Sequence, residues 1–222
     1  MSFSKKIKYF LVHQLKISYD EAQRLIETGE VQIDGLVARN NCFLEKNVEI
    51  IVSGNLVQER IKFTYYLLYK PRGIECTHNP EIRDNILPFM PNGLNLFSAG
   101  RLDKESEGLL FLTNDGDAAW QIMHTGIEKE YIVEVEETID EAFCEKMRRG
   151  VEILGQTTKP CEVFQVGEKS FRIILTQGMN RQIRRMCYKC GREVQFLKRI
   201  RIGNYLLGEL NTGEGKFVER ID

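Results

Sequence analysis

Asp103 is the residue of this chain best placed to do chemistry. It lies in the segment G-R-L-D-K-E-S-E-G-L-L-F-L-T-N-D-G, which runs from Gly100 to Gly116. A carboxylate can act as a nucleophile or as a base, and the cations Arg101 and Lys104 beside it favour its ionised form. Gly100 and Gly108 bracket the segment, as expected where a backbone turns sharply or approaches another group closely. From spacing alone a charged loop before a buried strand is the simpler interpretation, because one aspartate does not define a site.

Two further segments carry residue types that belong in enzyme sites. Lys129 to Tyr131, K-E-Y, opens a stretch that alternates apolar and acidic residues, which is typical of a strand. A tyrosine at the start of a strand is most often a core residue. Gly178 to Met186, G-M-N-R-Q-I-R-R-M, is predicted to be helical and contains three arginines. Adjacent residues of a helix do not share a face, so Arg184 and Arg185 are expected to point to different surroundings.

Together these segments resemble the pseudouridine synthases, in the branch that modifies ribosomal RNA. G-R-L-D followed by S-x-G-L-L-x-L-T-N-x-G is similar to the catalytic-aspartate motif of that family. K-P-x-G, at Lys70 to Gly73, also appears in this branch, so the resemblance covers nearly the whole chain from Lys70 onward. The stretches D-K-E-S-E-G-L, H-T-G-I-E-K-E-Y, I-L-G-Q-T-T-K-P-C and L-T-Q-G-M-N-R-Q-I-R-R-M-C look closest to members that act on large-subunit 23S ribosomal RNA.

The resemblance implies an isomerase that converts a uridine of RNA to pseudouridine. This reaction breaks the N1–C1′ bond, turns the uracil over and rejoins it through C5, and the base must first leave its stack. It needs no metal and no redox cofactor, so we expect none. The resemblance implies that Asp103 is the essential catalytic residue, that Tyr131 stacks on the uracil with its hydroxyl near the reacting centre, and that Arg184 pairs with Asp103. Whether Asp103 attacks as a nucleophile or acts as a base is left open.

The basic residues are unevenly distributed along the chain. The formal net charge is −1, yet the stretch from Arg181 to Arg201 contains Glu193 as its single acid. Such a basic stripe on a nearly neutral protein is the charge pattern expected of a surface that binds a phosphate backbone. The alternative interpretation is an ordinary solvated helix face. We therefore expect RNA as the partner, contacted by Arg101, Lys104, Arg181, Arg185, Arg192, Lys198 and Arg199.

The first part of the chain, residues 1–55, is predicted to be a small domain of its own. Apolar residues at helical spacing indicate a first helix, and Ser18 with Glu21 forms a capping box for a second. Short strands follow around the turn dipeptide Asp34-Gly35. This order resembles the S4 RNA-binding domain over roughly residues 5–53. Its cations and acids nearly balance, which leaves open how much it contributes to RNA binding.

Polar residues from Gly54 to Arg60 are predicted to form a linker to a catalytic domain over residues 62–222. There the pattern predicts a strand from Glu107 to Thr113 and a helix capped by Thr138 and Glu141. Strands outnumber helices and connections are short, which favours a mixed, largely antiparallel sheet with packed helices. The fold class expected for the whole chain is therefore α+β.

The composition restricts the remaining function classes. No apolar run approaches the ~20 residues that span a bilayer, and the N-terminus lacks a signal-peptide core. The cysteines do not form a disulfide scaffold, so a cytoplasmic protein is expected. Cys187 and Cys190 supply only half of a zinc site. We also expect a monomer without a membrane partner. Two alternatives to a ribosomal RNA synthase stay open: a synthase acting on tRNA, and a non-catalytic RNA-binding factor of ribosome assembly. The combination of Asp103, Tyr131 and Arg184 argues against the second.

Overall fold

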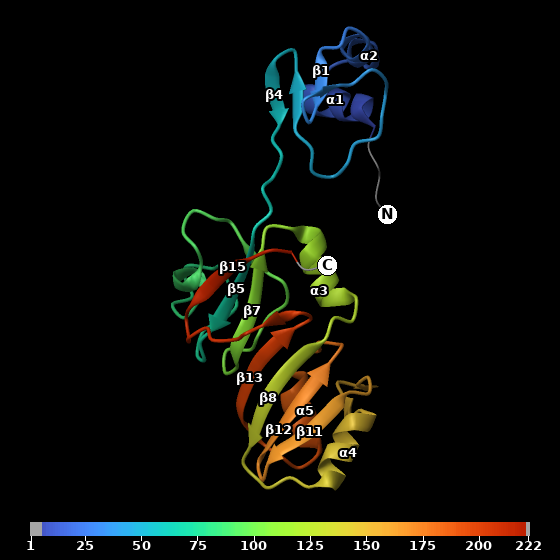
Figure 1. Ribbon diagram of the computed structural model, residues 1–222. Coiled ribbons are helices and arrows are strands. Elements are labelled where there is room, and N and C mark those ends of the chain that lie inside the picture. Colours follow the sequence, from blue (N-terminus) through green and yellow to red (C-terminus); the bar gives the residue numbers. More distant parts are fainter. Residues whose placement is uncertain (1–5, 221–222) are drawn as a thin grey trace. The chain divides into compact units, whose positions relative to one another are not determined.

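The computed structural model describes residues 6–220 and divides into two compact units, Met1–Lys62 and Phe63–Asp222 (Figure 1). Each unit has a hydrophobic core of its own. Helices and a mixed sheet are both present, which confirms the predicted α+β class. Residues 1–5 of the expected first domain and 221–222 of the second lie outside the described residues. In residues 6–220, no helix has the length and apolar character needed to cross a membrane.

The first unit contains two helices followed by a small antiparallel sheet. As predicted, the Ser18 hydroxyl accepts a hydrogen bond from the Glu21 amide at 3.1 Å, and Asp34 and Gly35 turn the chain with φ of 50° and 78°. Its sheet has the strand order β2-β1-β3-β4. The elements are α1 (Ile7–Leu15), α2 (Tyr19–Glu27), β1 (Val31–Ile33), β2 (Leu36–Val37), β3 (Ile50–Val52) and β4 (Asn55–Gln58).

The segment expected to be a linker is partly a strand. Ser53 and Gly54 adopt φ of 49° and 79° and close a tight hairpin, so β4 pairs with β3. The prediction was wrong here because the polar residues of β4 lie at the exposed edge of a small sheet, where an apolar pattern is not required. The Ser-Gly dipeptide was the available signal for the turn.

The second unit is built on a nine-stranded sheet. Its main path runs β11-β12-β8-β13-β7-β5-β15, with β14 paired to β13 and β6 paired to β7. The β13–β7 pair is parallel and the others are antiparallel, which confirms the predicted mixed, largely antiparallel sheet. The strands of this sheet are β5 (Tyr65–Lys70), β6 (Phe97–Ser98), β7 (Glu107–Thr113), β8 (Lys129–Val135), β11 (Glu162–Gly167), β12 (Ser170–Leu175), β13 (Val194–Ile202), β14 (Tyr205–Leu206) and β15 (Gly215–Val218).

Three α-helices, a short 3-10 helix and a separate hairpin complete this unit: α3 (Gly116–His124), α4 (Glu141–Arg149), α5 (Gln182–Lys189), η1 (Leu87–Phe89), β9 (Glu152–Ile153) and β10 (Gln156–Thr157). Helix α4 packs on β11, while α5 packs on β13 and the hairpin. Asp140 caps α4 by accepting a hydrogen bond from the Phe143 amide at 2.8 Å. The expected cap, Thr138, lies two residues too early, because Asp140 already satisfies the free amide of the first turn.

The strands β5 and β7 are buried on both faces, which explains their continuous apolar sequences. Leu109 and Phe111 belong to one core cluster, whereas Leu110 and Leu112 belong to another. This burial holds β7 in place and therefore fixes the loop that precedes it. Asp103 is in that loop.

Candidate active site

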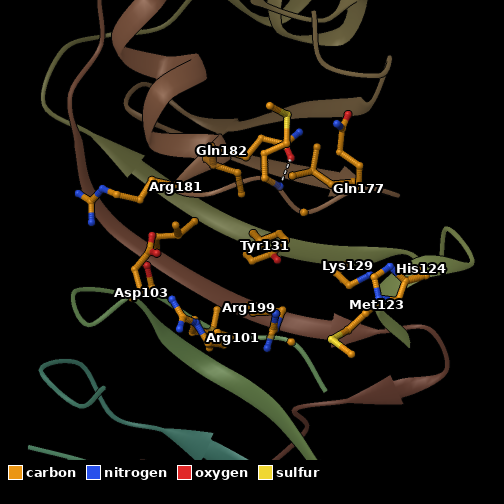
Figure 2. Close-up of a pocket in the computed structure, with 18 residues that line it drawn as sticks. Arg101, Asp103, Met123, His124, Lys129, Tyr131, Gln177, Arg181, Gln182 and Arg199 are labelled. Carbon is orange, nitrogen blue, oxygen red and sulfur yellow. Dashed lines mark hydrogen bonds between the residues drawn. The ribbon is translucent and has the colours of Figure 1, made fainter. Parts of the chain in front are cut away.

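A cavity of about 350 Å³ lies where the loop before β7, the strands β8 and β13 and the start of α5 meet. Asp103, Tyr131 and Arg199 line it, and Figure 2 shows the Tyr131 ring between Asp103 on one side and Lys129 on the other. Segments that are distant in sequence thus supply one pocket. The remaining lining residues include Arg101, Ser106, Met123, His124, Gln177, Met179, Arg181 and Gln182.

Backbone hydrogen bonds hold the loop that carries Asp103. The Asp103 carbonyl accepts a hydrogen bond from the Ser106 amide at 3.0 Å, and the Lys104 carbonyl accepts one from the Gly73 amide at 2.7 Å. Gly100 has φ of 82°, a region that favours glycine. The Asp103 side chain is 26% exposed, so it is accessible to a ligand from the pocket while most of its surface is covered.

Gly108 brings β7 against β13. A Cβ atom there would lie 2.3 Å from the carbonyl oxygen of Arg199, and φ is 107°. The prediction that Gly100 and Gly108 allow a turn and a close approach is confirmed. Without this approach the two strands could not pair in parallel at Gly108 and Arg199.

Arg184 reaches Asp103 from α5. Its Nε lies 3.9 Å from Oδ2 of Asp103, and its side chain is 12% exposed. The guanidinium also donates hydrogen bonds to the Glu105 carbonyl at 3.2 Å, the Ser106 hydroxyl at 3.1 Å and the Val194 carbonyl at 3.2 Å. Burial, with repulsion from Arg181 as the next cause, lowers the pKa of Arg184 from its usual high value. One guanidinium therefore ties α5 and β13 to the loop that carries Asp103.

The helical spacing explains this orientation of α5. Ile183, Met186 and Cys187 are buried and hold one face of the helix in the core. Arg184 is thereby placed at the edge of that face, next to the loop, whereas Arg181 and Arg185 lie outside the core. The predicted separation of Arg184 from Arg185 agrees with the structure.

Tyr131 is half-buried in the middle of the sheet. Its strand, β8, pairs with both β12 and β13, where Tyr131 lies opposite Ile173 and Arg199. The Arg199 guanidinium carbon lies 6.0 Å from the centre of the Tyr131 ring. Tyr131 packs against the core and also lines the pocket, and its stacking on a uracil stays a prediction.

Sequence reasoning gave no role to Lys129, which lines the pocket. It is 8% exposed, and its ammonium donates hydrogen bonds to the carbonyls of Ile122 and Ile127, both at 2.8 Å. Burial, with repulsion from Arg199 as the second cause, lowers its pKa to about 8. The K-E-Y motif was the signal, because a lysine that opens a buried strand needs a special environment.

Arg199 also differs from expectation. It is 2% exposed and donates from Nε to the Leu109 carbonyl at 2.7 Å, while its Nη2 is buried without a hydrogen-bond partner among residues 6–220. The structure places Arg199 in the wall of the pocket and not on an exposed basic surface, and its contact with RNA stays a prediction. Successive residues of a strand face opposite sides, so the basic run through β13 cannot form one exposed stripe. Arg201, in the same run, pairs with Glu128 at 2.9 Å and Glu130 at 2.6 Å.

The other predicted RNA contacts are spread over several surroundings. Arg101 is exposed at the pocket, and Arg181 pairs with Glu105 at 2.8 Å. The Lys104 ammonium pairs with Asp84 at 3.1 Å. Three more carry local contacts: Arg185 donates to the Asn180 carbonyl at 3.0 Å, Arg192 to the Thr138 carbonyl at 2.8 Å, and the Lys198 ammonium lies 4.7 Å from the Tyr69 ring centre.

The pocket is strongly positive. Arg101, Lys129, Arg181 and Arg199 line it together with one carboxylate, that of Asp103. A concave surface with one sign of charge concentrates ligands of the opposite sign. The site thus combines a positive pocket that suits an anionic ligand with one carboxylate available for chemistry.

Comparison with known proteins identifies the family. Residues 64–189 match the family described as RNA pseudouridylate synthase. The chain is 43% identical over 198 residues to the dual-specificity RNA pseudouridine synthase RluF of Escherichia coli (strain K12). The aligned region covers 87% of this chain and 68% of that protein. It is 32% identical over 218 residues to the ribosomal large subunit pseudouridine synthase B of Vibrio cholerae. That aligned region covers 92% of this chain and 68% of the relative.

A solved structure agrees with these relatives. A crystal structure of a pseudouridylate synthase, 26% identical, superposes with a TM-score of 0.69 over 97% of this chain and 96% of its own. The chain belongs to the RNA pseudouridylate synthase family. It is an RNA pseudouridine synthase, as the sequence motifs indicated.

Proposed function

We propose that this enzyme converts a uridine of large-subunit 23S ribosomal RNA to pseudouridine, with Asp103 as the essential catalytic residue. The observation that carries the proposal is that Asp103 and Tyr131 line one pocket, from a loop and a strand, while Arg184 of α5 lies 3.9 Å from the Asp103 carboxylate. The choice of RNA is supported by the names of the relatives, one of which is a ribosomal large subunit synthase.

The residues divide the reaction between them. The N1–C1′ bond breaks with its electron pair moving onto the uracil, C5 then bonds to C1′, the proton on C5 leaves, and N1 gains a proton, so that the overall change is an isomerisation. Asp103 acts at the sugar, as nucleophile or as base. Arg184 positions the Asp103 carboxylate and supplies a counter-charge in a covered site. Tyr131 stacks on the uracil that has left its helix.

Arg199 gives this pocket an additional means of stabilising the transition state. The carbonyl oxygens of uracil gain electron density when the N1–C1′ bond breaks. A guanidinium that lies beside the Tyr131 ring and has an unpartnered Nη2 supplies positive charge where that density develops. Arg199 therefore serves the flipped base rather than the phosphate backbone.

The first unit is proposed to be an S4-type RNA-binding domain that selects the RNA context. Its two helices and small sheet have the order expected for that domain, and its charge is nearly balanced. Deletion of residues 1–55 should keep hydrogen release measurable and raise the RNA concentration required. We also expect the enzyme to act as a monomer in the cytoplasm without a cofactor, and light scattering after size-exclusion chromatography measures its mass.

Mapping of pseudouridine in ribosomal RNA and tRNA tests the function. Cells with the wild-type gene, a deletion or Asp103→Asn are compared at every uridine. We expect one or more large-subunit sites to disappear equally in the deletion and in the Asp103→Asn cells. A site lost in the deletion but kept with Asp103→Asn would indicate a non-catalytic assembly factor.

A second RNA substrate is a candidate, because the Escherichia coli relative is named a dual-specificity enzyme, and tRNA is the alternative that the sequence motifs leave open. The same maps decide between the substrates. Loss at a tRNA position in addition to a ribosomal one would support two substrates, and loss in tRNA alone would contradict the ribosomal proposal.

A further inference from the structure

A second cavity, of about 500 Å³, lies between α5 and the tip of the β9–β10 hairpin. Five cations line it, with Glu193 as the one acid among the described lining residues. The cavity is not separate from the active site, because Arg181 lines both. We call this second cavity the α5 groove.

Two exposed apolar side chains face this basic surface. The Tyr188 side chain is on α5, and the residue is 78% exposed, the largest exposed fraction among the exposed large hydrophobic residues of the described chain. Leu154 is 55% exposed at the hairpin tip, and both residues line the α5 groove. An aromatic ring among cations is the combination with which proteins bind single-stranded nucleic acid, because bases stack on the ring and phosphates meet the cations.

The backbone at the hairpin tip supports a role in binding. Leu154 has φ of 51° and Gly155 has φ of 75°. Such turns strongly favour asparagine, aspartate or glycine at the first position, and a bulky residue with positive φ is an outlier. Leucine at Leu154 is therefore unfavourable for the turn and is exposed as well. Residues with strained backbones of this kind cluster at active sites and ligand clamps.

We propose that the α5 groove binds an unpaired nucleotide of the substrate RNA, with its base stacked on Tyr188 against Leu154 and its phosphates near Arg185 and Lys189. The inference rests on the proposed RNA substrate and adds a second contact point. RNA is favoured over an acidic protein as the occupant because the groove shares Arg181 with the pocket that is proposed to hold the uridine, so one RNA strand can reach both.

The donors available in the groove agree with this assignment. Lys189 is exposed at the end of α5 and carries a point charge. Arg185 is held by Nε and Nη2 on the Asn180 backbone carbonyl and side chain, at 3.0 and 3.2 Å, so its guanidinium has a fixed orientation. Arg192, by contrast, donates hydrogen bonds from Nε and Nη1 to the carbonyls of Thr138 and Gly191. It therefore contributes positive charge to the groove but not a pair of free N–H donors for a phosphate.

Fluorescence of 2-aminopurine tests the stacking. A short transcript that carries the mapped uridine is prepared with 2-aminopurine at each flanking position in turn, and it is bound to the full chain with Asp103→Asn, which holds substrate without turnover. We expect one flanking position to be quenched. Adding Tyr188→Phe should preserve the quenching, because stacking requires only the ring. Adding Tyr188→Ala should abolish it and weaken RNA binding about 5- to 150-fold.

Leu154→Gly and a control complete the test. Leu154→Gly relieves the positive φ, so it should raise the unfolding temperature while it reduces the quenching. Leu206→Ala, at a residue that is 58% exposed on β14, should change neither. If Tyr188→Ala binds and quenches like the parent protein, the proposal is wrong. Turnover of the same transcript by the wild-type enzyme is measured in parallel, so failure of the groove and failure of the proposed reaction are distinguishable.

Discussion

The Nε atom of Arg184 lies 3.9 Å from Oδ2 of Asp103 and is buried without a hydrogen-bond partner among residues 6–220. Three of its other four N–H groups donate to the Glu105 carbonyl, the Ser106 hydroxyl and the Val194 carbonyl. A buried donor that faces a carboxylate just beyond hydrogen-bond distance can form that bond after a small shift of either side chain.

Arg184→Ala should therefore lower kcat by about 100-fold or more, because loss of the guanidinium removes both the counter-charge and two hydrogen bonds that orient the loop. Arg184→Lys should be less harmful, since it keeps the charge but loses the planar fork. Single-turnover kinetics with saturating RNA measures the effect. If Ala and wild type have equal rates, another cation positions Asp103.

Substitutions of Tyr131 separate stacking from chemistry. Tyr131→Phe should bind RNA nearly as well as wild type, and it should slow the chemical step if the hydroxyl takes part in proton transfer. Tyr131→Ala should also lose about 1–3 kcal/mol of binding free energy, the amount for one stacked base. Equal effects of Phe and Ala on both binding and rate would reduce Tyr131 to a core residue.

Gly108→Ala tests the close approach of β7 and β13. Its Cβ would lie 2.3 Å from the Arg199 carbonyl oxygen, so the strands must separate, and we expect a loss of at least about 2 kcal/mol in unfolding free energy. Gly116→Ala, where a Cβ meets nothing within 4 Å, is the matched control and should not be destabilising. Denaturant titration compares them. Equal stability of the two variants would argue against this strand contact.

Lys129 makes the stability depend on pH in a definite direction. Its pKa is about 8 in the folded protein and about 10.4 when unfolded, so between these values the unfolded chain binds more protons. The contribution of Lys129 to the unfolding free energy therefore rises with pH in this window, by up to about 3 kcal/mol. The unfolding free energy of wild type minus that of Lys129→Met, measured from pH 7.5 to 10.5, should therefore become more positive as the pH rises. Lys216→Met, at an exposed lysine on β15, is the control, and a flat difference for Lys129→Met would refute this assignment.

Local sequence patterns predicted most of the elements. The capping box at Ser18, the Asp34-Gly35 turn and the strand from Glu107 to Thr113 depend on neighbouring residues and were found correctly. Motif resemblance also selected residues that meet in space, because Asp103, Tyr131 and Arg184 converge on the site.

Properties that depend on tertiary structure were not accessible. Arg199 was assigned to an exposed stripe, and its burial follows from the pairing of β13 with β7 and β8, which no local pattern specifies. Lys129 was unassigned for the same reason, since its carbonyl partners come from α3 and the following loop. The β4 strand was missed because edge strands of a small sheet need no apolar pattern.

Release of hydrogen from C5 of uridine by Asp103→Asn tests the central claim most directly. Asparagine keeps the volume of the side chain but can act neither as the nucleophile nor as the base, so release should fall by about 10²–10⁴-fold or more while RNA affinity is unchanged. Asp20→Asn, at an exposed aspartate of α2, is the control and should release hydrogen like wild type. Release at the wild-type rate by Asp103→Asn would contradict the assignment of Asp103 as the catalytic residue.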